Sequence, residues 1–369
     1  MKNFKIRIMC TILTVALGIT TMVGCGSAEV NGDRTVLTVD GTEISLGTAS
    51  LALRYAQAQT DMYYKQMAAL YEGLGASGQD WEATPEGESQ TSGELMKADI
   101  ISRLEKMAVV KEHAAEYGVE LGQSEKDRIA EAAKEFIESN DASVLRKMGV
   151  TQENVEEYLE LETYYRDAYE PMIKDKDTSV TDEEAKQSTV TYTFLSKNKL
   201  GEEEAKAAME ELLEEYKKED DIANFDMEAP TEGKDDGYMT STASFGDDDD
   251  EEGTGFDQAA KDAARTLKDG ELYQEVITGA GGGGFFIVRM DKVVDPEATE
   301  GKKESLEREK GREVFDEMVD KWVEEATVSV DEKVWQDVKL LNKEAYVVKV
   351  PETIPEPAAE EELAPAEEQ

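Results

Sequence analysis

The sequence has very little cysteine and histidine, and both shortages exclude whole classes of site. Its two cysteines, Cys10 and Cys25, lie within the first 25 residues, so no disulfide framework holds the folded part together. The single histidine is His113. Histidine-based zinc sites and Ser-His-Asp or Cys-His catalysis are therefore nearly ruled out, unless His113 itself serves.

Basic residues are scarce relative to acidic ones. Lys and Arg total 40 against 84 Asp and Glu, a formal net charge of −44 in 369 residues. Such a surface repels nucleic acid and anionic lipid headgroups, so we expect neither as a partner. Apolar residues still make up 39% of the chain, and with the recurrent helical periodicity they argue for folded domains.

An apolar run at residues 8–23 follows three basic residues and is too short for a typical membrane-spanning helix. It ends in M22-V23-G24-C25-G26-S27, which resembles a bacterial lipoprotein signal cut before the cysteine. We expect residues 1–24 to be a signal peptide, Cys25 to be lipidated and residues 25–34 to form a tether. The acyl chains would then anchor an extracytoplasmic protein to the bacterial cell membrane. An ordinary secretory signal with an incidental cysteine is the alternative.

Periodicity and turn signals give a coarse secondary structure for the rest of the chain. Strands are predicted over residues 35–39 and 42–45 around D40-G41, and over 189–195 and 285–290. Helices are predicted over residues 48–74, 94–117, 124–139, 152–169, 202–218 and 303–325.

Four sequence signals define where the predicted helices begin and end. A capping box Ser124-x-x-Asp127 and the cap Thr151 open two of them, and Thr181-x-x-Glu184 opens a short further one. Pro171 is expected to end or kink the helix in which it lies.

Four short motifs follow one another along the first half of the chain: V39-D40-G41-T42-E43-I44, E116-Y117-G118-V119, M148-G149-V150-T151 and V180-T181-D182-E183-E184. Their order and spacing resemble the helical chaperone domain of the SurA/PrsA group of secreted foldases. The resemblance implies an α+β protein whose discontinuous, SurA-like helical domain carries an inserted βα domain. The helical chaperone domain would span residues 35–187 and resume at 297–347, before an acidic, Pro-rich disordered tail at 348–369.

The segment between these parts, 188–296, contains G233-K234-D235-D236-G237-Y238 and, in its second half, GFDQAAKDAARTLKDGELYQEVITGAGGGGFFIVRM at 255–290. These stretches resemble a parvulin-like peptidyl-prolyl isomerase domain, in which residues 233–238 match the family's G-G-D-L-G-aromatic loop. The resemblance places Phe256 where the family's proline-gripping Phe lies. It therefore implies a socket for the proline ring.

The two histidines on which the family relies are absent. The family's A-R-H-I-L strand matches T191-Y192-T193-F194-L195, and its G-Y-H-I-I strand matches G284-F285-F286-I287-V288. Thr193 and Phe286 therefore stand in the two histidine places, and no catalytic residue is assigned. The predicted substrate-binding residues are Phe256, Tyr238, Thr193 and Phe286, although packing of the phenylalanines in a core is the plainer alternative.

The acidic run 247–252 raises the question of calcium. Aligned with an EF-hand loop from Asp248, it offers Ala259 where a bidentate Glu is needed, so a solvated acidic loop is the favoured interpretation. We predict no metal site and no cofactor. The Gly-rich stretch 279–284 leads into a strand and lacks a following Gly-Lys-Ser/Thr, so it is not interpreted as a phosphate loop.

The sequence thus predicts a membrane-anchored extracytoplasmic foldase that binds unfolded, newly exported polypeptides and carries an isomerase-like domain of doubtful activity. One alternative is an active isomerase with a rewired site using Thr193, Tyr238 and Phe256. Another is a non-catalytic surface lipoprotein. The client proteins and the oligomeric state, a homodimer included, stay open.

Overall fold

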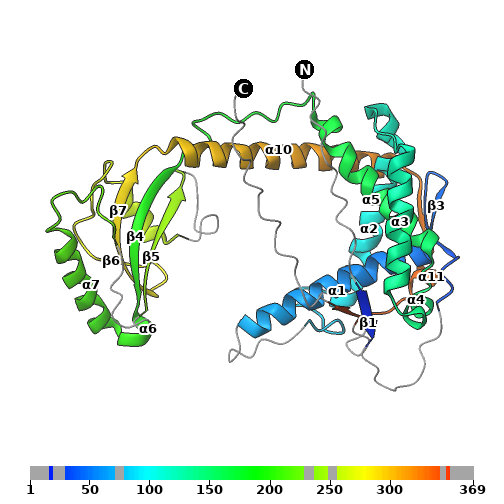
Figure 1. Cartoon of the computed structure of the whole chain (residues 1–369), viewed down its shortest axis with the longest axis horizontal. Helices are drawn as coiled ribbons and strands as arrows, with labels where there is room; N and C mark the ends of the chain where they lie inside the picture. Colours follow the sequence, from blue (N-terminus) through cyan, green and yellow to red (C-terminus); the bar gives the residue numbers. More distant parts are fainter. Residues whose placement is uncertain are drawn as a thin grey trace, which may run out of the picture. The chain divides into compact units, whose positions relative to one another are not determined.

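The protein was studied as a computed structural model, in which the chain divides into two compact units (Figure 1). Unit 1 comprises residues 1–175 and 315–369, and unit 2 comprises residues 176–314. Both helices and strands are present, so the predicted α+β class is confirmed. The structure describes residues 16–19, 30–70, 79–227, 237–247, 256–340 and 346–349.

Unit 1 begins with a hairpin of β2 (Thr35–Val39) and β3 (Thr42–Ser45), as predicted. Asp40 and Gly41 join them with φ values of 46° and 89°. Two successive positive φ values suit the right-handed twist of a tight hairpin. On its other side β2 pairs antiparallel with β8 (Val328–Val330), so the start and the end of the chain share one three-stranded sheet.

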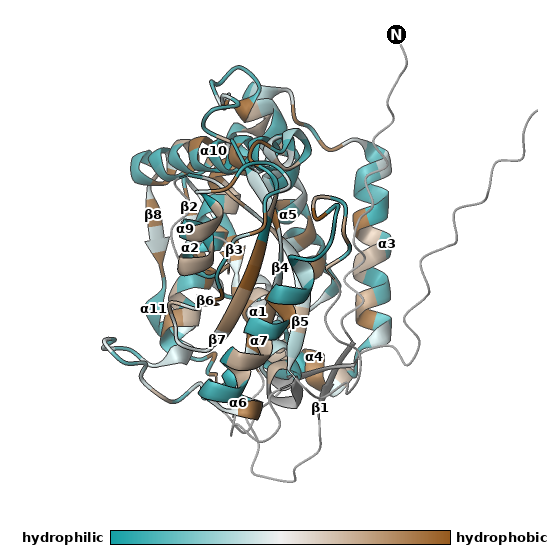
Figure 2. Cartoon of the chain, turned by 90° about the vertical axis from the view of Figure 1, so that its left-hand side faces the viewer, coloured by the Kyte–Doolittle hydropathy of each residue, from teal (hydrophilic) through white to brown (hydrophobic). Residues whose placement is uncertain are grey.

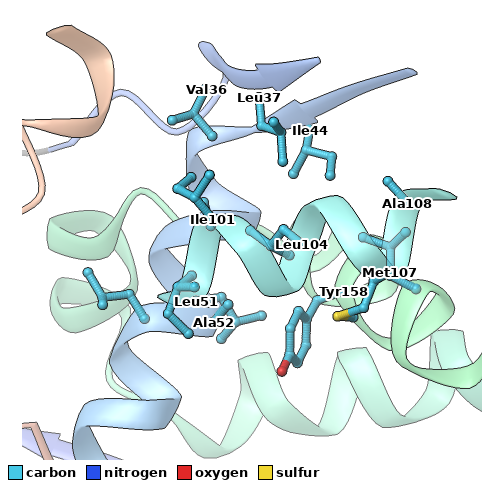
Figure 3. Close-up of a cluster of buried hydrophobic side chains, with 14 of the residues drawn as sticks. Val36, Leu37, Ile44, Leu51, Ala52, Ile101, Leu104, Met107, Ala108 and Tyr158 are labelled. Atoms are coloured by element: carbon cyan, nitrogen blue, oxygen red, sulfur yellow. The ribbon is translucent and has the colours of Figure 1, made fainter. Parts of the chain in front are cut away.

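The helices of unit 1 pack against this sheet. Figure 3 shows Val36, Leu37 and Ile44 from the strands lying over side chains of the first two long helices. The helices of unit 1 are α1 (Leu46–Leu70), α2 (Ser92–His113), the 3₁₀ helix η1 (Ala114–Tyr117), α3 (Gln123–Ser139), α4 (Ala142–Met148), α5 (Gln152–Ile173), the end of α10 (Pro296–Glu325) and α11 (Glu332–Trp335).

Of the three helix starts predicted from caps, the one at Thr151 is confirmed, and those at Ser124 and Thr181 are wrong. Thr151 caps α5 by accepting the N–H of Asn154 at 3.4 Å. Helix α3, in contrast, begins at Gln123 and not at a Ser124 cap, because the Glu125 carboxylate accepts the N–H of Gly122 at 2.8 Å. The hydrogen bond from the Gly122 N–H to the Glu125 carboxylate therefore makes Gly122 the N-cap and places the helix start before Ser124. Helix α2 and η1 end at Gly118, whose φ of 73° is the left-handed conformation that glycine adopts readily at the end of a helix.

Proline and capping signals around residue 175 behave differently from expectation. Helix α5 continues past Pro171 to Ile173, since a proline in the last turn removes only one backbone bond from a helix that is about to end. Thr181 and Glu184 form both capping-box hydrogen bonds, with Thr181 N–H donating to Glu184 Oε2 at 2.7 Å. They enclose a single turn and not a helix, because strand β4 starts soon afterwards.

Two short strands lie near the chain ends. β1 (Ala16–Ile19) pairs antiparallel with β9 (Tyr346–Lys349). β1 lies within the predicted signal peptide, whose other residues and Cys25 fall outside the described part of the chain. Val348 and Lys349, the first two residues of the predicted tail, belong to β9.

Unit 2 is a four-stranded antiparallel sheet in the order β5-β4-β7-β6. Its central strands β4 and β7 are both nine residues long, and the larger part of β7 is hydrophobic in Figure 2. The elements are β4 (Ser188–Ser196), α6 (Lys197–Leu200), α7 (Glu202–Tyr216), β5 (Tyr238–Phe245), α9 (Gln258–Ala264), β6 (Ile277–Thr278), β7 (Gly284–Lys292) and the first part of α10.

The strand register divides the side chains of this sheet into two clusters. Phe194 lies opposite Phe286, and Thr193 lies opposite Ile287. Successive strand residues point to opposite faces, so odd-numbered residues of β4 and β7 pack beneath α7 and even-numbered ones beneath α9. We call these the α7 face and the α9 face.

Candidate functional site

An open pocket of about 550 Å³ lies on the α9 face of the sheet. Its apolar lining comes from three strands and from Phe256, two residues before α9. These residues are Tyr192, Phe194, Met239, Phe256 and Phe286, and the rim is formed by Asp257, Gln258, Gly279, Ala280, Gly281, Gly283 and Gly284.

The aromatic rings of the pocket contact one another directly. Phe194 and Phe286 are cross-strand partners with ring centroids 4.8 Å apart. Tyr192 lies two residues before Phe194 on the same face of β4, and its ring centroid is 4.9 Å from that of Phe256. Phe256 meets Phe286 edge to face at 6.2 Å. Contacts of this geometry stabilise ring pairs, so the rings form a fixed surface.

Burial differs between the base and the edge of the pocket. Phe256 is 5% exposed and Phe286 8% exposed, so both are anchored in the core. Met239, on the neighbouring strand β5, is 47% exposed. An exposed, unbranched thioether beside anchored rings is an adaptable contact for an apolar ligand.

The carboxylate of Asp257 is the only acidic group in the described lining, and backbone donors occupy it. One oxygen accepts the N–H groups of Ala259 at 2.9 Å and Ala260 at 3.3 Å, which caps α9. The other oxygen accepts the N–H of Ala280 at 2.8 Å, which ties the Gly-rich loop to the helix. Asp257 therefore positions the rim of the pocket.

Two glycines let the rim approach the aromatic rings closely. A Cβ on Gly284 would lie 2.3 Å from the Leu195 carbonyl oxygen and 2.5 Å from the ring of Phe194. A Cβ on Gly279 would lie 3.0 Å from the ring of Phe286. The stretch interpreted as a simple loop is thus shaped by its contact with the aromatic surface.

Thr193 does not face this pocket. It is fully buried on the α7 face, where its hydroxyl lies 3.2 Å from the Tyr216 hydroxyl and 3.2 Å from that of Thr240. Burial raises the pKa of Tyr216, and the hydrogen bond from Thr193 offsets part of that rise. Thr193 and Phe286, the two residues in the predicted histidine places, therefore lie on opposite sides of one sheet.

Tyr238 is also on the α7 face, where it packs against the cluster beneath α7. Of the four predicted substrate-binding residues, the structure brings Phe256 and Phe286 together and places Thr193 and Tyr238 elsewhere. The reason is the period of two along a strand. The sequence interpretation missed Phe194, although alternation from Val190 through Tyr192 places it beside Phe286.

Other predicted features lie partly outside the described residues. Of the acidic run 247–252 only Asp247 is described, and its carboxylate lies 3.4 Å from the Lys186 ammonium. Within the described part of the chain, no three His, Cys, Asp or Glu side chains group as metal ligands, and no helix has the length and apolarity to cross a membrane. His113 stacks on Trp322 at 4.3 Å, a packing role.

Comparison with known proteins gives matches among solved structures only. No protein-family model and no curated protein matches the chain. A foldase protein, PrsA, from Lactococcus lactis is 17% identical with a TM-score of 0.32, covering 82% of this chain and 96% of that one. A peptidylprolyl isomerase, PrsA, from Bacillus cereus is 18% identical with a TM-score of 0.30, covering 71% and 97% respectively.

Proposed function

We propose that this protein is an extracytoplasmic foldase, anchored to the membrane through Cys25, that binds unfolded exported polypeptides without isomerase turnover. The observation that carries the proposal is the open aromatic pocket of unit 2, in which the ring of Phe286 contacts both Phe194 and Phe256. Such a surface accepts an apolar side chain or a proline ring from any extended chain.

The energetics of the pocket suit reversible capture. Burial of one Leu- or Phe-sized side chain is worth roughly 1.5–3 kcal/mol. A single pocket therefore contributes weak, sequence-tolerant binding, which allows release without a nucleotide. Weak binding of this kind also requires no polar side chain in a defined position beside the ligand.

The polar groups argue against catalysis. An isomerase lowers a barrier of ~18–20 kcal/mol to rotation about the peptide bond, which requires groups that favour the twisted amide over the planar one. Asp257 is occupied by three backbone N–H groups. The rewired site would need Thr193, Tyr238 and Phe256 together, and these residues lie on two faces of the sheet.

The binding test replaces a pocket ring and compares it with a ring outside the pocket. Phe194→Ala should weaken binding of a fluorescein-labelled, reduced and alkylated basic protein by about tenfold, measured by fluorescence anisotropy. Phe225→Ala is the matched control, because Phe225 is a half-buried ring that packs on the α7 face. Equal binding by both variants and the wild type would refute the pocket. No binding by any of them would favour the surface-lipoprotein alternative.

Turnover is tested separately. In a protease-coupled assay with an Ala-X-Pro peptide, we expect the wild-type protein to leave the cis-to-trans rate at its spontaneous value. A rate above that value would establish the active isomerase instead.

The anchor is tested in cells. With Cys25→Ser we expect the protein to move from the membrane fraction to the medium, because one residue carries the acyl chains. Retention of the variant in the membrane would overturn the lipid anchor and leave the binding proposal standing.

A further inference from the structure

Strand β5 forms one edge of the unit 2 sheet and is unusual in composition. Its eight residues read YMTSTASF, with no charged residue, proline or glycine, in a chain of which 34% is charged. It pairs with β4 along its whole length without a bulge. Within the described residues, no strand lies on its outer side.

Natural proteins usually protect such edges with charges, prolines, bulges or very short strands. The opposite edge of the same sheet follows this rule, since β6 has two residues. The sheet of unit 1 also follows it, because its edge strand β3 is four residues long and carries Glu43. β5 has none of these protections, so its edge is a template for another strand.

The register shows which backbone groups face outward. The N–H of Ser196 donates to the Gly237 carbonyl oxygen at 3.3 Å, which fixes the hydrogen-bonded pairs between β4 and β5. In an antiparallel pair these alternate with non-bonded pairs. Thr240, Thr242 and Ser244 occupy the non-bonded positions, so their N–H and C=O groups project away from β4.

The edge adjoins the aromatic pocket. Met239 of β5 lines the pocket, and Ala243 packs with the cluster on the same face. A strand added beside β5 lies about 4.8 Å away, and alternate side chains of that strand would lie next to Met239. The backbone edge and the pocket can therefore hold one extended segment together.

We propose that β5 binds an extended segment of an unfolded polypeptide as a fifth strand of the sheet, through backbone hydrogen bonds. This inference rests on the proposed polypeptide-binding function but uses a different part of the sheet. Charge determines the occupant. The chain has a net charge of −44, and the sequence after β5 runs DDDDEE at 247–252. A neutral or basic segment fits this environment, whereas a second copy of the chain is repelled.

The test removes one outward N–H without altering the pairing of β5 with β4. Thr242→Pro does so, because proline is tolerated on an edge strand where its nitrogen faces outward. Thr242→Val is the matched control, since it changes the same side chain and keeps the N–H. The probe is a fluorescein-labelled 12-residue peptide of alternating Thr and Val with two lysines at each end, without aromatic residues or proline.

Thr242→Pro should weaken peptide binding at least about tenfold, and Thr242→Val should stay within about twofold of the wild type by anisotropy. The far-ultraviolet circular dichroism of both variants should match the wild type. Equal binding by all three proteins would overturn strand addition. If Thr242→Pro loses its native circular dichroism, an N-methylated version of the peptide replaces it, and undiminished binding of that peptide would overturn the proposal.

The two proposals fail separately. If Phe194→Ala leaves binding of the unfolded protein unchanged but Thr242→Pro abolishes peptide binding, strand addition at β5 is supported and binding in the aromatic pocket is refuted. The reverse result refutes strand addition at β5 and supports binding in the aromatic pocket. A wild-type dimer in sedimentation that Thr242→Pro dissociates would identify a second copy as the occupant and overturn this inference.

Discussion

The two faces of the unit 2 sheet are built from alternate residues of the same strands, yet one face is closed and the other open. On the α7 face, Leu195 and Ile287 are fully buried. On the α9 face, Phe194 is half-buried and Met239 is 47% exposed. What differs is the length of the covering helix, which is 15 residues for α7 and seven for α9.

Helix geometry explains how much of each face is covered. At about 1.5 Å per residue, α7 is roughly 22 Å long and α9 roughly 10 Å. A nine-residue strand spans about 30 Å. The short helix therefore covers about a third of the strands, and the Gly-rich loop borders the rest without filling it. The pocket follows from this shortfall.

The faces also differ in where their polar groups are used. Arg289 is 8% exposed on the α7 face, where it donates to Asp291 Oδ1 at 2.7 Å and to the carbonyl oxygen of Ile222 at 2.8 Å. Together with Thr193, it ties the closed face by hydrogen bonds. The open face presents rings to its pocket, which is why we interpret it as a binding surface.

The largest expected effect is a loss of stability on replacing Arg289, which lies on the closed α7 face. Arg289→Met leaves Asp291 without its charged partner and removes the donor to the half-buried carbonyl groups of Ile222 and Phe225, so unit 2 should lose about 3 kcal/mol of unfolding free energy. All three tryptophans, Trp81, Trp322 and Trp335, belong to unit 1. Tryptophan fluorescence in urea therefore follows unit 1 alone, and circular dichroism follows both units.

The control is Arg308→Met, which removes an exposed arginine paired with Glu304 on α10. A pair of this kind contributes less than about 1 kcal/mol. If both arginine variants unfold at the same urea concentration, Arg289 does not hold the closed face together.

The next prediction concerns Gly284, at the rim of the pocket on the open α9 face. Gly284→Ala forces a methyl group against the Leu195 carbonyl and the Phe194 ring, so unit 2 should lose about 2 kcal/mol and binding of apolar peptides should weaken. Gly281→Ala is the control, because a Cβ there meets nothing within 4 Å. Equal urea midpoints for the two alanine variants would show that the rim does not need its close approach.

The sequence predicted the covering helix better than the surface beneath it. Helix α7 was expected at residues 202–218 and spans Glu202–Tyr216, because the Ala, Met and Leu positions of this segment repeat at the helical period. β4 was expected at 189–195 and spans Ser188–Ser196. Strong local periodicity therefore identified both elements.

Two failures concern the strands of unit 2 and have different causes. β5 was not predicted, because an edge strand that is exposed along much of its length lacks the apolar alternation on which a strand prediction depends. The motif match placed Thr193 in a pocket position that the structure gives to Phe194. A shift of one residue moves a side chain to the opposite face, and register depends on partner strands that a local motif does not contain.

A third prediction sharpens the role of Thr193. Thr193→Val removes a buried hydroxyl that contacts Tyr216 and Thr240, so unit 2 should lose about 1 kcal/mol. Binding of unfolded polypeptide should stay unchanged, because the residue lies on the closed face. Thr242→Val, with an exposed side chain, is the matched control. Loss of polypeptide binding with unchanged stability would instead show that Thr193 contributes to substrate binding.

The smallest expected effect is a pH dependence confined to the closed face. Burial raises the pKa of Tyr216 above the value of 10.0 for a free tyrosine. The folded state therefore holds this proton more tightly, and the associated stability is fully present below pH 10 and is lost as the pH rises through the folded pKa.

One tyrosine changes the free energy by at most about 1.4 kcal/mol per pH unit, so the loss between pH 10 and pH 11 has an upper limit of about 1.4 kcal/mol. We would measure urea unfolding of unit 2 by circular dichroism at pH 9 and pH 11, for the wild type and Tyr216→Phe. The variant should show the smaller decrease between the two pH values, since its ring carries no proton to release. An equal decrease in both proteins would mean that water reaches the Tyr216 hydroxyl, and the α7 face would then be less closed than its packing indicates.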